Sequence, residues 1–212
     1  MKIMSFNLAK MNRSKIRYVC LLLLTIKINS VSGQTNFREG FIINNQHDTI
    51  KGLIDYRGDI KNSTTCIFKK DENSTPIKYL PGEIKGYRFM DGKFYISRLV
   101  KVGDEEKNLF LEYLVNGIVD LYYYRDFEND YYFVEKECED MIELTNEKKE
   151  LIRDARNEYY SKSIVYSNLY IGILKALFAD CEEVAKKADN TKFEHNSLIK
   201  ITKSYHDYVC DW

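Results

Sequence analysis

Short hydrophobic runs separated by polar turns recur through residues 38–135, and this pattern predicts β-strands. Asp91-Gly92 and Asn116-Gly117 each separate two such runs, and these dipeptides favour the positive φ angles of a tight hairpin turn. A short extended piece is expected at 76–80. Strands are expected at 40–43, 49–56, 65–68, 84–90, 93–100, 108–115, 118–124 and 131–135. Because each strand should pair with the next, we expect an antiparallel meander of about eight strands that rolls into a half-open barrel.

The hydrophobic period becomes helical from Thr145 onward. One predicted helix carries an apolar stripe made of Leu144, Leu151, Ile152, Ala155 and Tyr159. A second helix is expected at Ser163–Ala179 and should be buried, since it is apolar on most sides. A third is expected at about His195–Val209. The expected fold class is therefore α+β, with an antiparallel β domain at 34–140 followed by a three-helix lobe at 141–212.

Residues 1–33 have the layout of a secretory signal peptide. The basic residues Lys10, Arg13, Lys15 and Arg17 precede an apolar run at Tyr18–Ile26, and Val31-Ser32-Gly33 offers small residues before a cleavage site. The run is too short to span a bilayer, so no transmembrane helix is expected in a mature chain that starts near Gln34. The expected location is extracytoplasmic: the periplasm, the outer membrane or the medium. A translation start at Met11, a retained membrane anchor and a short buried N-terminal element remain open alternatives.

The charge balance argues against a nucleic-acid partner. Lys and Arg together number 32, as do Asp and Glu, so no global basic field exists to hold a phosphate backbone. The chain contains 17 Tyr and 11 Phe but only 2 Pro, a composition that favours regular strands with half-buried faces. We therefore expect a folded globular protein, and the sequence does not indicate its oligomeric state.

Four cysteines follow the predicted signal peptide: Cys66, Cys138, Cys181 and Cys210. In an oxidising compartment they allow three disulfide connectivities. We favour the pair Cys181 and Cys210, which flank the last predicted helical segments. In a strict antiparallel helical hairpin these two residues would lie at opposite ends, so the bridge requires either that the helices cross or that an extra turn near Glu182–Lys187 redirects the chain.

The sequence predicts no catalytic residue, no cofactor and no metal. It lacks nucleophile-elbow and glycine-rich phosphate-binding motifs. His206 and Cys210 share a helical face, but a zinc site needs three or four ligands. Asp126, Glu128 and Asp130 alternate as in a calcium loop, yet the sixth position is a tyrosine where the sharp turn needs glycine. A polar hairpin turn is the expected structure there.

Tyrosines at 122, 124 and 131 form the one candidate interaction patch. Tyr122-Tyr123-Tyr124 and Tyr131-Tyr132-Phe133 place aromatic side chains on both faces of two adjacent predicted strands. One face should belong to the core, and the other is either covered by the helices or exposed to a protein partner or a glycan. If the patch is functional, Tyr122, Tyr124 and Tyr131 should be exposed together.

Several structural motifs of the chain occur together, among them Asp48–Tyr56, Glu83–Tyr87, Leu121–Tyr124 and Tyr170–Lys175. This set resembles the N-terminal extracytoplasmic region of exported envelope proteins of Bacteroidota, in many of which an outer-membrane β-barrel follows. The resemblance covers nearly the whole predicted mature chain but brings no catalytic residue. It implies an envelope location beside a barrel. The chain ends at Trp212, where longer relatives continue, so either a natural short form or a truncated reading frame is expected.

These observations lead to two alternative functions. The first is a non-enzymatic binding or scaffolding module of the cell envelope, associated with the outer membrane, whose partner is an envelope protein or a glycan. The alternative is a secreted hydrolase that uses paired carboxylates, which would require two acidic side chains to converge in a cleft.

Overall fold

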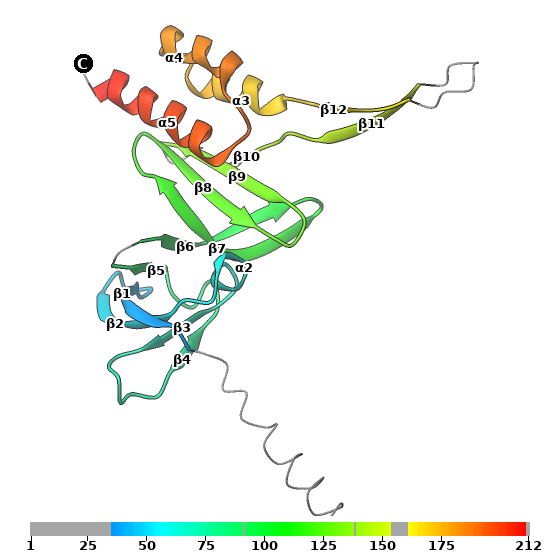
Figure 1. Ribbon diagram of the computed structural model, residues 1–212. Coiled ribbons are helices and arrows are strands. Elements are labelled where there is room, and N and C mark those ends of the chain that lie inside the picture. The colour runs from blue at the N-terminus through cyan, green and yellow to red at the C-terminus, as the bar shows by residue number, and fades with distance from the viewer. Residues whose placement is uncertain (1–34, 91, 138, 154–160, 211–212) are drawn as a thin grey trace, which may run out of the picture. The chain divides into compact units, whose positions relative to one another are not determined.

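The computed structural model describes residues 35–90, 92–137, 139–153 and 161–210 (Figure 1). The predicted signal peptide at 1–33, Cys138 and the side chain of Cys210 lie outside the described part. The described strands and helices belong to one compact unit, Asn36–Trp212. The strands are β1 (Phe37–Ile43), β2 (Thr49–Asp55), β3 (Cys66–Lys69), β4 (Ile77–Tyr79), β5 (Gly86–Phe89), β6 (Phe94–Val102), β7 (Glu105–Val115), β8 (Val119–Arg125), β9 (Asp130–Lys136), β10 (Ile142–Leu144), β11 (Lys148–Arg153) and β12 (Ser161–Tyr166). The helices are α2 (Asp59–Asn62), α3 (Leu169–Leu177), α4 (Glu182–Lys187), the 3₁₀ turn η3 (Ala188–Asn190) and α5 (His195–Cys210).

An open antiparallel sheet of ten strands forms most of the fold, in the order β10-β9-β8-β7-β6-β5-β1-β2-β3-β4. The α+β class and the antiparallel sheet are thus as predicted, but the strand number is ten rather than about eight. The expectation that each strand pairs with the next is wrong at one place, because β5 pairs with β1 instead of β4. Gly40 of β1 makes this pairing possible, since a Cβ there would lie 2.4 Å from the Arg88 carbonyl oxygen of β5.

Both predicted hairpins are present. Strands β5 and β6 pair with Arg88 opposite Phe94, and the amide of Phe89 donates a hydrogen bond to the Lys93 carbonyl oxygen across the turn. Strands β7 and β8 pair across the turn that contains Gly117, with a register shift between Tyr113 and Val115. Turn chemistry thus correctly predicted which strands are neighbours.

The three-helix lobe differs from the prediction. The segments 148–153 and 161–166 form an antiparallel two-stranded sheet, β11–β12, where helices were expected. The predicted stripe residues Ala155 and Tyr159 lie outside the described part. Helix α3 begins only at Leu169, after Asn168 adopts a left-handed φ of 53° that interrupts a continuous helix. Helix α5 confirms the third predicted helix, and the short helix α4 was not predicted.

Three hydrophobic clusters of buried residues stabilise the described unit. One lies among β1, β2, β3, β5, β6 and β7. The other two occupy opposite faces of the sheet around β8: one is covered by α3, α4 and α5, and the second is formed by side chains of β6, β7, β8 and β9. A residue on β8 therefore enters the helix-covered cluster or the strand-only cluster according to the face on which its side chain lies.

Candidate binding cleft

A large cleft lies where four parts of the chain meet: the turn between β8 and β9, strand β10, the start of β11 and the segment that leads into α5. Its volume is about 1250 Å³. Pockets that hold one small molecule measure about 300–1000 Å³, so this cleft is large enough for a segment of a macromolecule. The candidate site, called the cleft below, is lined by six aromatic residues, Tyr123, Tyr131, Tyr132, Tyr166, Tyr170 and Phe193, and by six acidic ones, Asp104, Glu128, Asp130, Glu143, Glu147 and Glu194.

The floor of the cleft is a set of aromatic rings that connect the sheet to the helices. Tyr123 of β8 meets the ring of His195 edge to face at 5.0 Å between centroids, and Tyr132 of β9 meets Phe193 in the same way at 5.2 Å. Tyr170 of α3 packs against Phe193 at 5.0 Å and donates a hydrogen bond to the Thr191 carbonyl oxygen. Edge-to-face contacts of this kind fix ring orientation as well as burying area, so the floor is preorganised.

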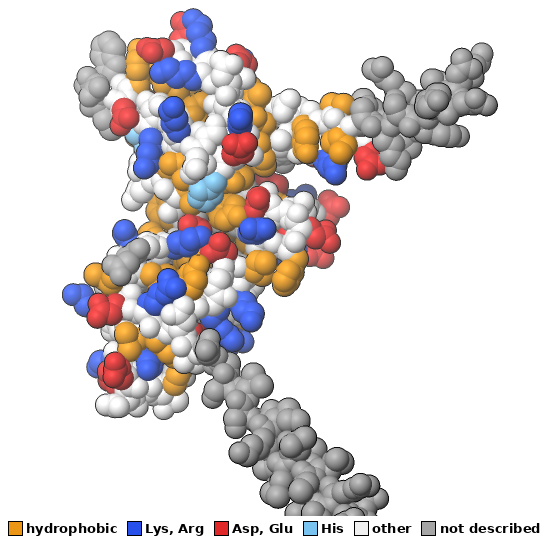
Figure 2. Space-filling view, in the orientation of Figure 1, with side chains coloured by type: hydrophobic (Ala, Val, Ile, Leu, Met, Phe, Trp, Pro, Cys, Tyr) orange, Lys and Arg blue, Asp and Glu red, His pale blue; other side chains and the backbone are white. Residues whose placement is uncertain are grey.

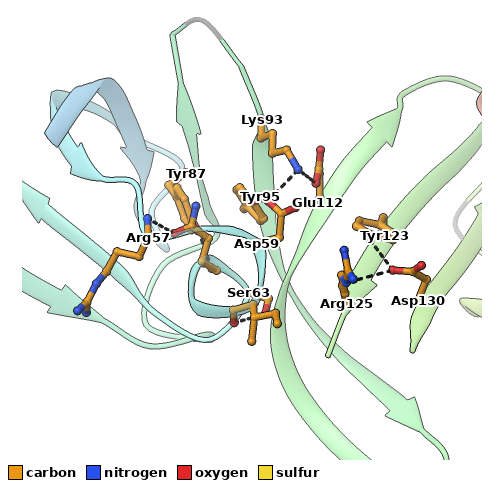
Figure 3. A network of polar contacts seen from close by, with 12 residues as sticks. Arg57, Asp59, Ser63, Tyr87, Lys93, Tyr95, Glu112, Tyr123, Arg125 and Asp130 are labelled. Atoms are coloured by element: carbon orange, nitrogen blue, oxygen red, sulfur yellow. Dashed lines mark hydrogen bonds and ion pairs between the residues drawn. The ribbon is translucent and has the colours of Figure 1, made fainter. Parts of the chain in front are cut away.

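One carboxylate of the rim, Asp130, is held by two partners. The hydroxyl of Tyr123 donates a hydrogen bond of 2.6 Å to Asp130 Oδ1, and Arg125 Nε lies 3.7 Å from the same oxygen (Figure 3). Burial and, after it, this hydrogen bond raise the pKa of Tyr123, so its hydroxyl stays protonated and remains a donor.

Glu143 of β10 is the half-buried carboxylate of the cleft. Burial raises its pKa, because a low-dielectric environment disfavours the charged form. Within the described residues, neither Glu143, Glu128 nor Glu194 has an ion-pair partner. Acidic residues therefore outnumber basic ones in the cleft, where six carboxylates stand against the two lysines Lys148 and Lys192.

The strands β11 and β12 form a two-stranded arm beside the cleft, seen apart from the ten-stranded sheet in Figure 1. Its base is fixed to the start of α3: the amide of Tyr170 donates to the Thr145 carbonyl oxygen, and the amide of Ser167 donates to the Glu147 carbonyl oxygen, both at 2.9 Å. Hydrophobic side chains of the arm face solvent (Figure 2). They are Ile164, Val165 and Tyr166, with exposed fractions of 53%, 45% and 51%.

The predicted tyrosine patch is not an exposed surface. Tyr122 is fully buried and Tyr124 nearly so, both in the strand-only cluster, where Tyr124 stacks on the half-buried Tyr131. The expectation of joint exposure is wrong because side chains of β6 and β7, such as Ile96 and Leu111, cover this face. Of the three residues only Tyr131 also lines the cleft. The prediction missed Tyr123 and Tyr132 as cleft residues. They lie opposite each other in the β8–β9 register, and the consecutive tyrosines of the two strands were the sequence feature that could have indicated them.

The acidic run after β8 forms a turn, as expected. Asp126 Oδ1 accepts hydrogen bonds from the amides of Glu128 and Asn129, and its other oxygen accepts one from the hydroxyl of Tyr131. The ring of His206, which the sequence offered as a metal ligand, lies against the backbone of Val119. Within the described residues, no three His, Cys, Asp or Glu side chains are placed to hold a metal ion.

The described cysteines carry free thiols. Cys66 and Cys181 are both buried, and burial raises the pKa of the Cys66 thiol. The predicted pairing of Cys181 with Cys210 stays a prediction, since the side chain of Cys210 lies outside the described part.

A second, smaller pocket of about 630 Å³ lies beside Arg38, Tyr56 and Lys93. Its lysine already has two carboxylate partners. Lys93 Nζ lies 2.8 Å from Asp59 and 2.7 Å from Glu112 (Figure 3). Burial lowers the pKa of Lys93, but the hydrogen bonds to the two carboxylates outweigh it and raise the pKa overall. This arrangement is a structural ion network, so the larger cleft is the better candidate site.

Comparisons with known proteins give no match to a family model, to a curated protein or to a solved structure. Of the helices that the structure describes, none has the length and apolar character needed to cross a membrane.

Proposed function

We propose that this protein is an exported, non-enzymatic binding module of the cell envelope, and that its cleft holds an extended, positively charged polypeptide segment. The observation that carries the proposal is the combination of an excess of carboxylates in the cleft with an ordered aromatic floor. Lysine and arginine side chains are attracted both to carboxylates and to aromatic faces, and their aliphatic stems cover apolar surface. The size of the cleft favours a chain segment over a small molecule.

The envelope location is supported by the sequence. A signal-like segment at 1–33 and the resemblance to exported envelope proteins of Bacteroidota both favour an extracytoplasmic module associated with the outer membrane. Intact mass spectrometry on envelope fractions of the native host tests this point. We expect a chain that starts at Gln34; a chain with the whole of residues 1–33 in the cytoplasmic fraction would contradict export. The same measurement with and without reduction and alkylation tests the disulfide between Cys181 and Cys210.

Fluorescence anisotropy with labelled peptides tests the ligand class. Fluorescein-labelled hexa-arginine should bind, and the triple variant Glu128→Gln, Glu143→Gln, Glu194→Gln should bind at least about tenfold more weakly, since charge-assisted contacts contribute about 1.5–3 kcal/mol each. The matched control removes three exposed carboxylates elsewhere, at Glu72, Glu182 and Glu183, and should bind as the wild type does. Equal binding by both variants, or binding of neutral cello- or chitohexaose alone, would contradict the proposal.

One observation favours a second candidate, a hydrolase. Burial raises the pKa of Glu143 in an aromatic cleft that also contains Asp130, and two carboxyl groups that share a cleft are the arrangement of paired-carboxylate glycosidases. A panel of p-nitrophenyl glycosides tests it. Turnover that disappears in both the Glu143→Gln and the Asp130→Asn variants would favour the hydrolase over the binding module.

A further inference from the structure

One tyrosine hydroxyl of the cleft has no hydrogen-bond partner. Tyr132 of β9 lines the cleft and is only 4% exposed, yet its hydroxyl makes no hydrogen bond with a described residue. Among the described side chains, the one polar atom that is fully buried and lacks a hydrogen bond is Asn62 Nδ2. The small exposed part of Tyr132 therefore includes its hydroxyl oxygen, which faces the cleft. Such a hydroxyl can bind a ligand without first breaking a bond within the protein.

Two carboxylates lie beside this hydroxyl. Asp130 precedes Tyr132 by two residues on β9, so the two side chains lie on the same face of the strand. Glu194 lies between Phe193 and His195 in the sequence. The rings of these two residues contact the Tyr132 ring, at 5.2 Å and 6.2 Å between centroids. Burial and, after it, the charges of Asp130 and Glu194 raise the pKa of Tyr132 to about 12, so its hydroxyl stays protonated beside both carboxylates.

Both carboxylates keep an acceptor oxygen that no described side chain uses. The hydrogen bond from Tyr123 and the ion pair of Asp130 both involve Oδ1, so Oδ2 has no such partner (Figure 3). Glu194 forms no ion pair within the described residues. The two lysines of the cleft, Lys148 and Lys192, pair with neither carboxylate in the described part of the chain. A cation from outside the chain can therefore reach both groups.

We propose that Tyr132, Asp130 and Glu194 form an ammonium subsite, which binds the side-chain ammonium group of a lysine in the segment that the cleft holds. An ammonium group carries three N–H donors, and the subsite offers three separate acceptors, namely the hydroxyl oxygen and one oxygen of each carboxylate. A guanidinium group favours both oxygens of one carboxylate at once, and Tyr123 already occupies one oxygen of Asp130. The inference rests on the proposed function, since it names the side chain that enters the cleft.

The rest of the cleft favours the same occupant. Carboxylates outnumber lysines in the cleft, and the aromatic floor can contact the aliphatic stem of a lysine side chain. A divalent cation fits less well, because within the described residues no three His, Cys, Asp or Glu side chains are placed to hold one.

Removal of one hydroxyl tests the subsite without disturbing the fold. Tyr132→Phe keeps the ring contacts and breaks no hydrogen bond to a described residue, so urea unfolding should show the stability of the wild type. Fluorescence anisotropy on the full exported chain uses hexa-lysine labelled with fluorescein at its N-terminus, so that all its amines are side-chain groups. Tyr132→Phe should bind this peptide about tenfold more weakly than the wild type does. It should bind hexa-arginine, labelled in the same way, less than about threefold more weakly.

The matched control removes a similar hydroxyl outside the cleft. Tyr124 is also nearly buried, its hydroxyl makes no hydrogen bond with a described residue, and it belongs to the strand-only cluster. Tyr124→Phe should bind both peptides as the wild type does.

A double variant shows whether Tyr132 and Asp130 act on the same group. Asp130→Asn keeps an acceptor for Tyr123 but removes the charge, so it should also weaken hexa-lysine binding. The variant that combines Asp130→Asn with Tyr132→Phe should lose less than the product of the two single losses, since both side chains contact one ammonium group.

Three results would overturn the subsite: unchanged hexa-lysine binding by Tyr132→Phe, equal losses for the two peptides, or single losses that simply multiply in the double variant. In each case the proposed function stands if the wild type binds the peptides and the triple variant Glu128→Gln, Glu143→Gln, Glu194→Gln binds them more weakly. Failure of the wild type to bind either peptide would contradict the proposed function itself, and the subsite with it.

Discussion

Tyr122 and Tyr123 are neighbours on β8, yet they are buried in two different cores. The hydroxyl of Tyr122 donates to a carboxylate oxygen of Asp120 or of Glu135, each 3.0 Å away, in the strand-only cluster. The hydroxyl of Tyr123 donates to Asp130 at the rim of the cleft. Because alternate side chains of a strand lie on opposite faces, a single residue step separates a structural tyrosine from one that lines the candidate site.

This relationship predicts different effects for two otherwise identical substitutions. Tyr122→Phe removes a hydrogen bond donor from two carboxylates and should lower the free energy of unfolding by about 1–2 kcal/mol. It should leave hexa-arginine binding unchanged. Tyr123→Phe should release Asp130 and strengthen hexa-arginine binding, since that carboxylate loses its donor. Urea unfolding and anisotropy on both variants check this, and a change in affinity for Tyr122→Phe would show that the two faces are coupled.

Lys93 neutralises a buried carboxylate, and its removal should be costly. Glu112 is 7% exposed and lies 2.7 Å from Lys93 Nζ. Lys93→Met leaves that charge unpaired and should lower the free energy of unfolding by about 3 kcal/mol, the usual cost of breaking one partner of a buried pair. The control is Lys175→Met, which breaks an exposed pair with Asp189 and should cost less than about 1 kcal/mol. Equal losses in chemical denaturation would contradict this distinction.

Glu143 should make stability depend on pH in a definite direction. Its pKa is raised in the folded state, so the folded protein binds this proton more readily than the unfolded chain does. The resulting destabilisation is complete above the folded pKa and disappears below the unfolded pKa. Glu143→Gln should therefore be more stable than the wild type at pH 7, with a difference that vanishes as the pH falls below the range of ordinary glutamates. A pH-independent difference in melting temperature would be inconsistent with this cause.

The turn between β7 and β8 has no room for a side chain at Gly117. A Cβ there would lie 2.2 Å from the ring of His206, which is itself held against the backbone of Val119. Gly117→Ala should cost about 1–3 kcal/mol by displacing α5 from the sheet, as over-packing does. At Gly172 in α3 a Cβ meets nothing within 4 Å, so Gly172→Ala should stabilise by about 0.5–1 kcal/mol. Thermal unfolding of the two variants compares the effects, and shifts in the same direction would contradict the packing argument.

The sequence predicted the local pairing of strands well and their long-range arrangement less well. A turn dipeptide such as Asn116-Gly117 favours a tight turn between the two strands that flank it in the sequence, so both hairpins could be predicted from local sequence. The pairing of β1 with β5 depends on contacts between residues far apart in the chain, such as Ile42 and Tyr87 at a separation of 45 positions, which no local pattern encodes. The segment after Thr145 was predicted as a helix because Leu151 and Ile152 fit a helical stripe, but strand pairing with β12 decides the outcome.

The cleft could be predicted only in part. Aromatic residues on both faces of β8 and β9 predicted that one face belongs to a core and that the other is either covered by helices or exposed to a partner. The sequence did not indicate which face is which. The choice depends on where α3 and α5 pack, and Phe193 and His195 come to the cleft from a segment more than 50 residues away from β9. Glu143 lies in β10, a strand of three residues that is too short to show a period of its own.

Carbodiimide cross-linking of hexa-lysine to the protein tests directly whether the cleft holds a positively charged segment. The reagent joins an amine to a carboxylate only when the two are in contact, and mass spectrometry of the linked peptides identifies that carboxylate. We expect links to Glu128, Glu143 or Glu194 of the cleft rim. Links that are equally frequent at the exposed carboxylates of Glu72, Glu182 and Glu183, or no link to the rim, would show that the cleft does not hold such a segment.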